Sequence, residues 1–417
     1  MACSLTYVLK QHSPLIHYQG YQSGAFLSDA ALKAAIDDKM GNELIGSRKK
    51  TIYSLYSELT GQIIRREYKQ VMDRNTLYFG DQGKDTKSLF VFTKEPIKLC
   101  ISDYRSVKTN PKEEVFNESL FEESLKYALA MNNFGKRGTK GFGSFWLKDG
   151  ICLEDYLRKP GVLPEGFSVF KLKVNLSRMN PPIINNTDCW TLYQQCYDLI
   201  DTYYKRLKSG INFPERNDPR RSIIYAKSLL QGYVSNKLGS TWDKKHLKDY
   251  ILNETTPSNL KMYRFMLGFA QGHEYRRKTH SAHGYGEHGN FNINFKIVHK
   301  ESLRESDIMR IPSPINFKIV QKNLNEADIL FFVNPCVQSE EYERLRYVDI
   351  AAHAQYKGNK DLLLALGDFD LNDFLRYSID KIDSDIICPN PGFFLKKRLE
   401  YIRNNLVELP KTEKKVL

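Results

Sequence analysis

The chain has 417 residues and carries 62 Lys or Arg against 49 Asp or Glu, which gives a formal net charge of +13. Its length allows two domains with cores of their own, and its apolar fraction of 41% is normal for globular proteins. The excess of positive charge favours a polyanionic partner, although a basic protein without a nucleic-acid role stays open on charge alone.

Cysteine usage and hydropathy exclude several further classes. The seven cysteines are dispersed and form no C-x-x-C pair, so neither a zinc knuckle nor a disulfide framework is indicated. Such a set fits reduced thiols in a cytosol. No run of about 18 apolar residues occurs, and residues 1–9 lack the long apolar region of a secretory signal. We therefore expect a soluble, cytoplasmic protein without a membrane span.

The first part of the chain alternates between strand and helix patterns. Strands are predicted at 5–12, 76–79, 88–92, 97–102, 143–148 and 168–175, and helices at 28–40 and 118–131. Ser28 is the expected N-cap of the first helix. Strand, helix, paired strands, helix, strand is the βαββαβ order of a ferredoxin-like fold, whose sheet can present cations and stacking residues to single-stranded RNA.

The Pro181-Pro182 step marks a predicted domain boundary. Residues 1–180 are expected to form the ferredoxin-like domain, and residues 181–417 a helical region followed by a second such domain. Helices are predicted at 188–208, 219–239 and 392–406, and strands at 291–298, 310–320 and 328–333. Arg220 and Arg221 fall in the first turn of the predicted helix 219–239, where the helix dipole disfavours cations, which hints at an anionic partner.

The most informative stretch is N-N-F-G-K-R-G-T-K-G-F-G-S-F, from Asn132 to Phe145. It interleaves four glycines with Lys136, Arg137 and Lys140. Glycine permits positive φ and close backbone approach, so such a loop can turn its N–H groups toward one anion, most obviously a phosphate. A P-loop is not indicated, because no G-x-x-x-x-G-K-[ST] occurs and the order helix, loop, strand is reversed. The alternative without a ligand is a loop that is rich in glycine only because it turns sharply.

Residues 134–145, the glycine-rich loop, resemble the loop between the last helix and last strand in proteins of the RAMP superfamily, the RNA-binding subunits of CRISPR effector complexes. Within that superfamily the chain looks most like the first subunit of the Cmr-type (type III-B) complex, because residues 310–314 (R-I-P-S-P) and 266–268 (M-L-G) are similar to segments there. It lacks the Trp-rich, Arg-bearing helix of that subunit at residues 32–40. The resemblance implies an α+β fold of tandem ferredoxin-like (RRM-like) domains, the second degenerate and with a helical insertion.

The same resemblance implies a non-catalytic RNA-binding subunit of a type III CRISPR ribonucleoprotein in antiviral defence. It would need no cofactor, and it would bind guide RNA near its 3′ end, target RNA, or both, beside other subunits of the complex. Phe142 would either stack on a base or brace the loop. The candidate RNA-binding residues are Ser28, Lys33, Arg48, Lys49, Lys50, Gly135, Lys136, Arg137, Gly138, Thr139, Lys140, Gly141, Phe142, Tyr275, Arg276, Arg277 and Arg310.

Three alternatives remain open on the sequence. Residues 272–289 hold four of the nine histidines, but their spacing matches no zinc signature, so we predict no metal site and expect either a second RNA-contacting loop or a polar disordered loop. A RAMP-type endoribonuclease that processes guide RNA could use His12 or His17 as a base on a ribose 2′-OH, although a strand histidine is more often structural. A basic scaffold for acidic proteins, without RNA, is the third.

Overall fold

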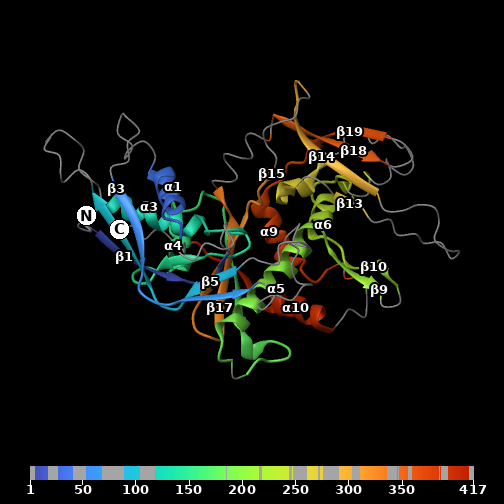
Figure 1. Ribbon diagram of the computed structural model, residues 1–417. Coiled ribbons are helices and arrows are strands. Elements are labelled where there is room, and N and C mark those ends of the chain that lie inside the picture. The colour runs from blue at the N-terminus through green and yellow to red at the C-terminus, as the bar shows by residue number, and fades with distance from the viewer. Residues whose placement is uncertain are drawn as a thin grey trace. The chain divides into compact units, whose positions relative to one another are not determined.

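The computed structural model (Figure 1) describes residues 5–16, 27–40, 53–67, 89–103, 118–184, 186–215, 218–243, 247, 261–270, 273–275, 291–302, 310–335, 345, 347–355, 359–384, 386 and 393–412. The chain divides into two compact units. The first unit comprises Met1–Asp201, Asn316–Phe332 and Asn405–Leu417, and the second unit comprises Thr202–Ile315 and Val333–Asn404.

A ferredoxin-like sheet opens the chain, as predicted. Its strands are β1 (Leu5–Gln11), β3 (Tyr53–Leu59), β6 (Ile97–Asp103) and β7 (Phe145–Leu147), in the spatial order β3-β6-β1-β7. Every neighbouring pair is antiparallel. Helix α1 (Asp29–Met40) follows β1 and helix α3 (Glu118–Met131) follows β6, which completes the βαββαβ order.

Both helices cover this sheet with an apolar face. In α3 the buried residues Phe121, Leu125, Ala128 and Leu129 recur at helical spacing and belong to the core of the first unit. Leu32, Ile36 and Met40 do the same in α1, and the two helices lie side by side in Figure 1. The predicted N-cap is confirmed, because the Ala31 N–H donates to Ser28 Oγ at 3.3 Å.

The two middle strands of this fold are parts of a longer, bent hairpin. Past the bend, β4 (Ile63–Glu67) pairs with β5 (Leu89–Thr93), and β5 also pairs with β2 (Leu15–Ile16). Sequence reasoning found β5 and β6 but missed β3 and β4, although Tyr53 and Leu55 alternate with more exposed residues as half-buried strands do. The strand predicted at 76–79 lies outside the described residues.

A second sheet repeats the topology of the first. Its strands are β8 (Val169–Asn175), β16 (Ile315–Gln321), β17 (Glu326–Val333) and β20 (Leu406–Leu409), in the order β16-β17-β8-β20. Along the chain, α5 (Cys189–Lys208) follows β8, and α9 (Leu371–Asp380) and α10 (Phe393–Asn405) follow β17. Both sheets therefore place their strands in the order second, third, first, fourth, and the predicted tandem ferredoxin-like fold is confirmed. Strand β8 belongs to the second sheet although it precedes the boundary predicted at residue 180.

The second ferredoxin-like domain is degenerate in one specific way. Helix α10 ends at Asn405 and β20 begins at Leu406, so no loop separates its last helix from its last strand. In the first domain the glycine-rich loop fills that position. Helix α4 (Leu153–Arg158) joins the two domains along the chain, and the 3-10 turn η3 (Leu176–Arg178) follows β8 within the second domain.

Long insertions into the second domain make up most of the second unit. Between α5 and β16 lie β9 (Ile211–Glu215), β10 (Asp218–Ala226), α6 (Leu229–Asn236), β11 (Lys261–Met262), η4 (Tyr263–Leu267), β12 (Phe269–Ala270), β13 (His273–Tyr275), β14 (Phe291–His299) and β15 (Arg310–Ile311); β18 (Val348–Gln355) and β19 (Asn359–Leu366) follow β17. A five-stranded sheet, β11-β19-β18-β14-β13, has its own apolar core, which includes Phe265, Phe295 and Ile350.

The helix predicted at 219–239 is wrong over its first part. Residues 218–226 form strand β10, which pairs with β9, and the helix covers only Leu229–Asn236, with Ser228 as its N-cap. Arg220 and Arg221 therefore lie in a strand, where no helix dipole acts on them. The hint of an anionic partner that we drew from their position is withdrawn.

Candidate nucleic-acid interface

The backbone of the glycine-rich loop bonds to the protein itself. Phe134 N–H donates to Gly143 O at 2.9 Å, and Lys136 N–H donates to Ile16 O at 2.8 Å. The N–H groups of six loop residues have protein acceptors: Phe134, Lys136, Lys140, Gly141, Gly143 and Ser144. These six groups are not available to a phosphate, so the expectation of a nest of N–H groups aimed at one anion is wrong for them.

Close packing explains two of the glycines. Gly143 has a φ of +69°, and a Cβ on it would lie 1.9 Å from Phe134 O. Gly141 has a φ of +88°, and its Cβ would lie 3.1 Å from Ile200 of α5 and 3.3 Å from Ile319 of β16. At both positions glycine is required because the backbone approaches another segment closely at a positive φ.

Phe142 braces the loop and does not face solvent. Its ring is fully buried and stacks on Tyr197 of α5, with centroids 3.9 Å apart, and on Phe90 of β5, with centroids 5.7 Å apart. Of the two roles expected for this residue, the packing supports bracing. The expectation that Phe142 could stack on a base is wrong, because a fully buried ring offers no free face.

All three cations of the loop are half-buried. Arg137 adopts a left-handed backbone conformation with a φ of 61°. The Nζ atom of Lys140 is buried, and the Lys140 backbone forms a parallel bridge with Phe317 of β16. Lys136 and Arg137 therefore stay candidates for phosphate contact, whereas the buried Nζ atom of Lys140 does not support that role for Lys140.

Strand β16 holds the junction between α3 and the loop. Asn316 Nδ2 donates to Met131 O at 2.8 Å, and Lys318 Nζ donates at 2.6 Å to both Leu129 O and Asn132 O. In return, Asn133 Nδ2 donates at 2.7 Å to Phe317 O and to Gly138 O. Two side chains of the second sheet thus satisfy carbonyls that the end of α3 leaves without helical partners. We call Asn316 and Lys318 the β16 clamp.

Sequence reasoning missed the β16 clamp. The alternation in Ile315–Gln321 puts Asn316 and Lys318 on one face of the strand, which reads as a solvent face. In the structure both side chains are buried, because the first domain covers that face. The polar residues Asn316 and Lys318 were themselves the signal, but their hydrogen-bond partners lie nearly two hundred positions earlier in the chain.

The buried ammonium group of Lys318 makes stability depend on pH. Burial lowers the pKa of Lys318 from 10.5 to about 7. Between those values the unfolded chain binds a proton that the folded chain releases, so the stability that Lys318 contributes is present at high pH and is lost as the pH falls toward 7. Burial, with Lys10 nearby, lowers the pKa of His12 to about 3, so His12 stays neutral throughout.

We therefore expect the free energy of unfolding of the wild-type protein, relative to Lys318→Met, to rise between about pH 6.5 and about pH 9. Urea unfolding of both proteins at a series of pH values measures this difference. Lys10 and all other titrating groups are shared by the two proteins and cancel. A difference that stays constant over this interval would contradict the assignment of the pKa shift to Lys318.

His12 is enclosed by the protein. It is 6% exposed, and its Nδ1 lies 3.3 Å from the carbonyl oxygen of Gln321 in β16. A general base must reach the proton it takes from the substrate, and a ring buried just after β1 does not reach a ribose. His12 is therefore corrected from a candidate base to a structural residue, and His17 lies outside the described residues.

The other predicted RNA-binding residues are scattered. Lys33 pairs with Asp37 at 2.8 Å and lies 3.7 Å from the centre of the Tyr53 ring, so its ammonium group is held within the first domain. Tyr275 in β13 and Arg310 in β15 are described as strand positions only. Arg48, Lys49, Lys50, Arg276 and Arg277 lie outside the described residues.

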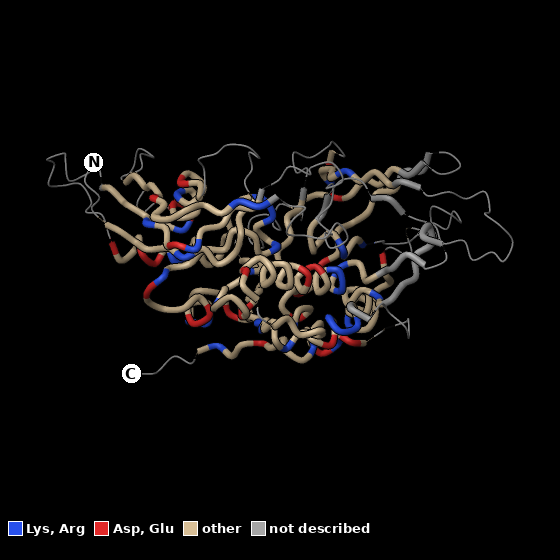
Figure 2. Tube along the Cα trace, turned by 60° about the horizontal axis from the view of Figure 1, so that its bottom comes forward, with Lys and Arg blue, Asp and Glu red and all other residues tan. Residues whose placement is uncertain are grey.

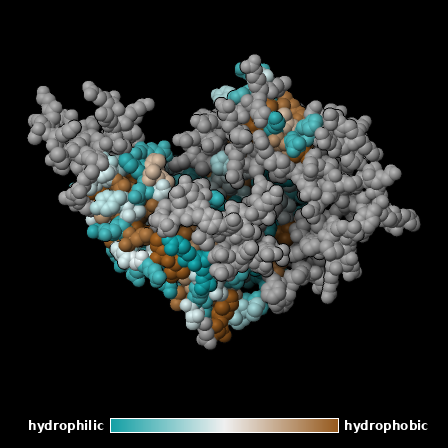
Figure 3. Space-filling view, in the orientation of Figure 1, coloured by the Kyte–Doolittle hydropathy of each residue, from teal (hydrophilic) through white to brown (hydrophobic). Residues whose placement is uncertain are grey.

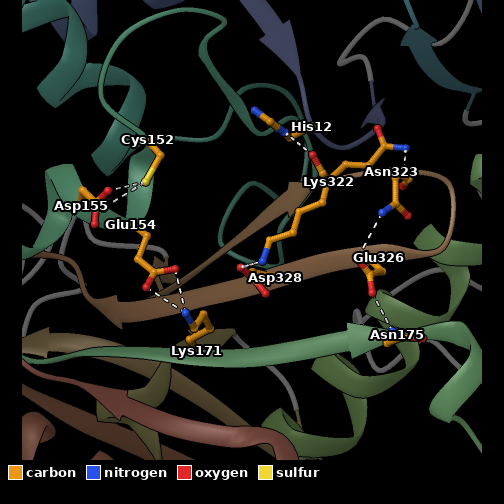
Figure 4. A network of polar contacts seen from close by, with 11 residues as sticks. His12, Cys152, Glu154, Asp155, Lys171, Asn175, Lys322, Asn323, Glu326 and Asp328 are labelled. Atoms are coloured by element: carbon orange, nitrogen blue, oxygen red, sulfur yellow. Dashed lines mark hydrogen bonds and ion pairs between the residues drawn. The ribbon is translucent and has the colours of Figure 1, made fainter.

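Polar contacts also join α4 to the second sheet (Figure 4). Lys171 of β8 pairs with Glu154 of α4 at 2.8 Å, and Lys322 pairs with the buried Asp328 of β17 at 2.7 Å. Arg158 Nε at the end of α4 donates to Pro410 O at 2.7 Å, just beyond β20. These contacts fix the segment after β7 to the second sheet. The side of the sheet that they occupy carries carboxylates as well as amines.

Surface composition alone singles out no site on the described residues. In Figure 2, Lys and Arg positions are interspersed with Asp and Glu positions along the trace. On the face shown in Figure 3, apolar residues lie among polar ones. No group of three or more His, Cys, Asp or Glu among the described residues is placed to hold a metal ion. None of the described helices is both long and apolar enough to cross a membrane.

Two ferredoxin-like sheets in tandem, with a glycine-rich loop before the last strand of the first, define a RAMP protein. The chain matches the Cmr1 N-terminal domain over residues 47–211 and the Cmr1 C-terminal domain over residues 225–405. These matches span most of the chain, which therefore belongs to the Cmr1 family, a RAMP component of type III-B CRISPR effector complexes in antiviral defence. The resemblance drawn from the sequence is confirmed.

A solved structure and the curated proteins were also compared with the chain. The crystal structure of Cmr1 from Pyrococcus furiosus in its apo form is 12% identical, with a TM-score of 0.33. The similarity covers 78% of this chain and 87% of that one. No curated protein matches the chain.

Proposed function

We propose that this subunit of a type III CRISPR effector complex binds RNA, without catalysing its cleavage, at the half-buried part of the glycine-rich loop that carries Lys136 and Arg137. The ligand is the phosphate backbone of guide RNA near its 3′ end, of target RNA, or of both. Lys136 and Arg137 supply the positive charge. The loop is the one predicted from the sequence, but its contacts to phosphate come from the side chains of Lys136 and Arg137 and not from its backbone N–H groups or Lys140.

The observation that carries the proposal is the position of Lys136 and Arg137 on a fixed base. Both are half-buried, and Lys136 N–H is bound to Ile16 O. The loop beneath them is held by its own hydrogen bonds and by the β16 clamp. Cations on such a base lose little conformational entropy when they meet a phosphate, so less of the interaction energy is offset.

A binding role without catalysis is supported by the enclosure of His12, one of the two candidate bases; the other, His17, lies outside the described residues. His12 is buried and stays neutral, with a pKa near 3. The Cmr1 family is a non-catalytic part of its complex. The proposed subunit therefore positions RNA for the other subunits.

We expect the double substitution Lys136→Ala and Arg137→Ala to weaken binding of a fluorescently labelled single-stranded RNA and to make it less dependent on salt. Each neutralised phosphate contributes about 0.7 to the slope of log K against log salt for single strands, so the slope falls in magnitude by about 1.4. Fluorescence anisotropy of the full-length protein over a salt series measures both quantities.

The matched control is Lys227→Ala with Lys300→Ala. Both of these lysines are exposed, and their loss changes the net charge by the same two units. We expect this control to leave the salt slope close to that of the wild type. Equal slopes for the loop variant and the wild type would overturn the proposal. RNA affinity that is independent of salt in the wild type would favour the alternative scaffold for acidic proteins.

A further inference from the structure

Lys318 lies at the base of the loop and not on its surface. Its side chain is fully buried, and its Nζ donates to Leu129 O in the last turn of α3 and to Asn132 O just after it. The loop cation Lys136 follows Asn132 by only four positions. Lys318 thus holds the point from which the backbone of the loop departs.

The rest of the β16 clamp acts on the same point. Asn316 Nδ2 donates to Met131 O, and Asn133 Nδ2 ties the start of the loop to Phe317 O. Phe317 N–H also donates to Thr139 O at 3.3 Å, on the far side of Lys136 and Arg137. Both ends of the segment that carries the two cations are therefore bonded to β16, the start to three consecutive residues and the far end to Phe317.

Removing the Lys318 amine leaves two carbonyls near the end of α3 without their donor. A buried carbonyl without a partner is costly, so the end of the helix has to move or admit water. A change at Lys318 is thereby expected to displace the start of the loop.

We propose that Lys318 is a positioning residue for RNA binding: without touching RNA, it fixes the end of α3 and so determines where Lys136 and Arg137 meet the phosphate backbone. This inference rests on the proposed function of the loop. A side chain of the second domain would thereby set the geometry of an RNA contact in the first domain.

A double-mutant cycle with RNA affinity as the readout tests the inference. Lys318→Met, which keeps most of the side-chain volume, is combined with the loop variant Lys136→Ala and Arg137→Ala in the full chain. In the wild-type background we expect Lys318→Met to lower affinity for labelled single-stranded RNA about tenfold, within the range of coupled neighbours. In the loop-variant background we expect no further loss. Lys148→Met, which removes an exposed lysine of the first unit, is the control.

A purely structural role gives a different result. General destabilisation, or a direct contact of Lys318 with RNA, would lower affinity equally in both backgrounds, and either outcome overturns the inference. No loss in the wild-type background also overturns it. Should Lys318→Met fail to fold, Asn316→Ala, which removes the donor to Met131 O and the 3.4 Å acceptor of Asn133 Nδ2, replaces it in the same cycle.

Hydrogen exchange separates failure of this inference from failure of the proposed function. We expect Lys318→Met to speed exchange of the Phe134 and Lys136 amides, whose acceptors are Gly143 O and Ile16 O, while amides of β6 keep their protection. Faster exchange without any effect of the loop variant on RNA binding would mean that the loop is positioned but does not bind RNA. Unchanged exchange would mean that Lys318 does not position the loop.

Discussion

Alanine at position 143 is expected to destabilise the protein by about 4 kcal/mol or more, a size that single substitutions rarely reach. Its Cβ would lie 1.9 Å from Phe134 O, an atom of the backbone that no side-chain rotation can remove. The positive φ of +69° adds strain of about 1–2 kcal/mol for any residue with a Cβ. Urea unfolding measured by circular dichroism gives the difference.

Gly161→Ala separates the two causes of this loss. Gly161 also has a positive φ, of +87°, but no atom lies within 4 Å of the position that its Cβ would occupy. We expect this variant to lose only the conformational strain, about 1–2 kcal/mol. If the two variants were equally destabilised, close packing would not be the reason for glycine at position 143.

Truncation of Phe142 is the second large effect that we expect. Phe142→Ala removes a fully buried ring from between Phe90 and Tyr197 and should cost about 3–5 kcal/mol, the range for loss of a buried aromatic side chain. The cavity would open between the glycine-rich loop and α5. Thermal or urea unfolding of the full chain measures the loss.

Two companion variants show whether the loss comes from burial in this stack. Phe142→Leu keeps most of the apolar volume, and we expect it to cost less than half as much as the alanine variant. Tyr56→Ala removes an aromatic ring that is 41% exposed, and its effect should stay below about 1 kcal/mol. A Phe142→Ala variant as stable as the wild type would mean that the ring is not a brace.

Elements set by local pattern could be predicted from the sequence. Helix 118–131 coincides with α3, strand 168–175 with β8 and helix 392–406 with α10, because each carries a regular apolar period over a full element. The N-cap at Ser28 follows from short-range chemistry. The order of these elements was enough to infer the fold class.

Elements set by distant packing could not be predicted in the same way. Ile223, Ile224 and Ala226 fit a helical spacing as well as a strand, and pairing with β9 decides for the strand. The glycine-rich loop was recognised, but its N–H groups were expected to face an anion. Their acceptors, such as Pro14 O and Ile16 O, lie more than a hundred positions earlier. Nothing local in the loop identifies those acceptors.

The two copies of the ferredoxin-like fold have different tasks around the loop. The first supplies the loop between α3 and β7, and the second supplies the β16 clamp and the Tyr197 face of α5. The second has no corresponding loop, since α10 leads straight into β20. The two ferredoxin-like domains thus form an asymmetric pair, in which the second domain holds the glycine-rich loop of the first.

Synthesis on the ribosome imposes an order on this arrangement. The first sheet is complete once β7 has been made, and domains at the N-terminus generally fold first. Residues 315–321 emerge much later, after the long insertion, and until then the carbonyls at the end of α3 have only water as donors. A nascent chain that stops before β16 therefore lacks the donors of the β16 clamp, and the base of the loop acquires them only when the second domain is made.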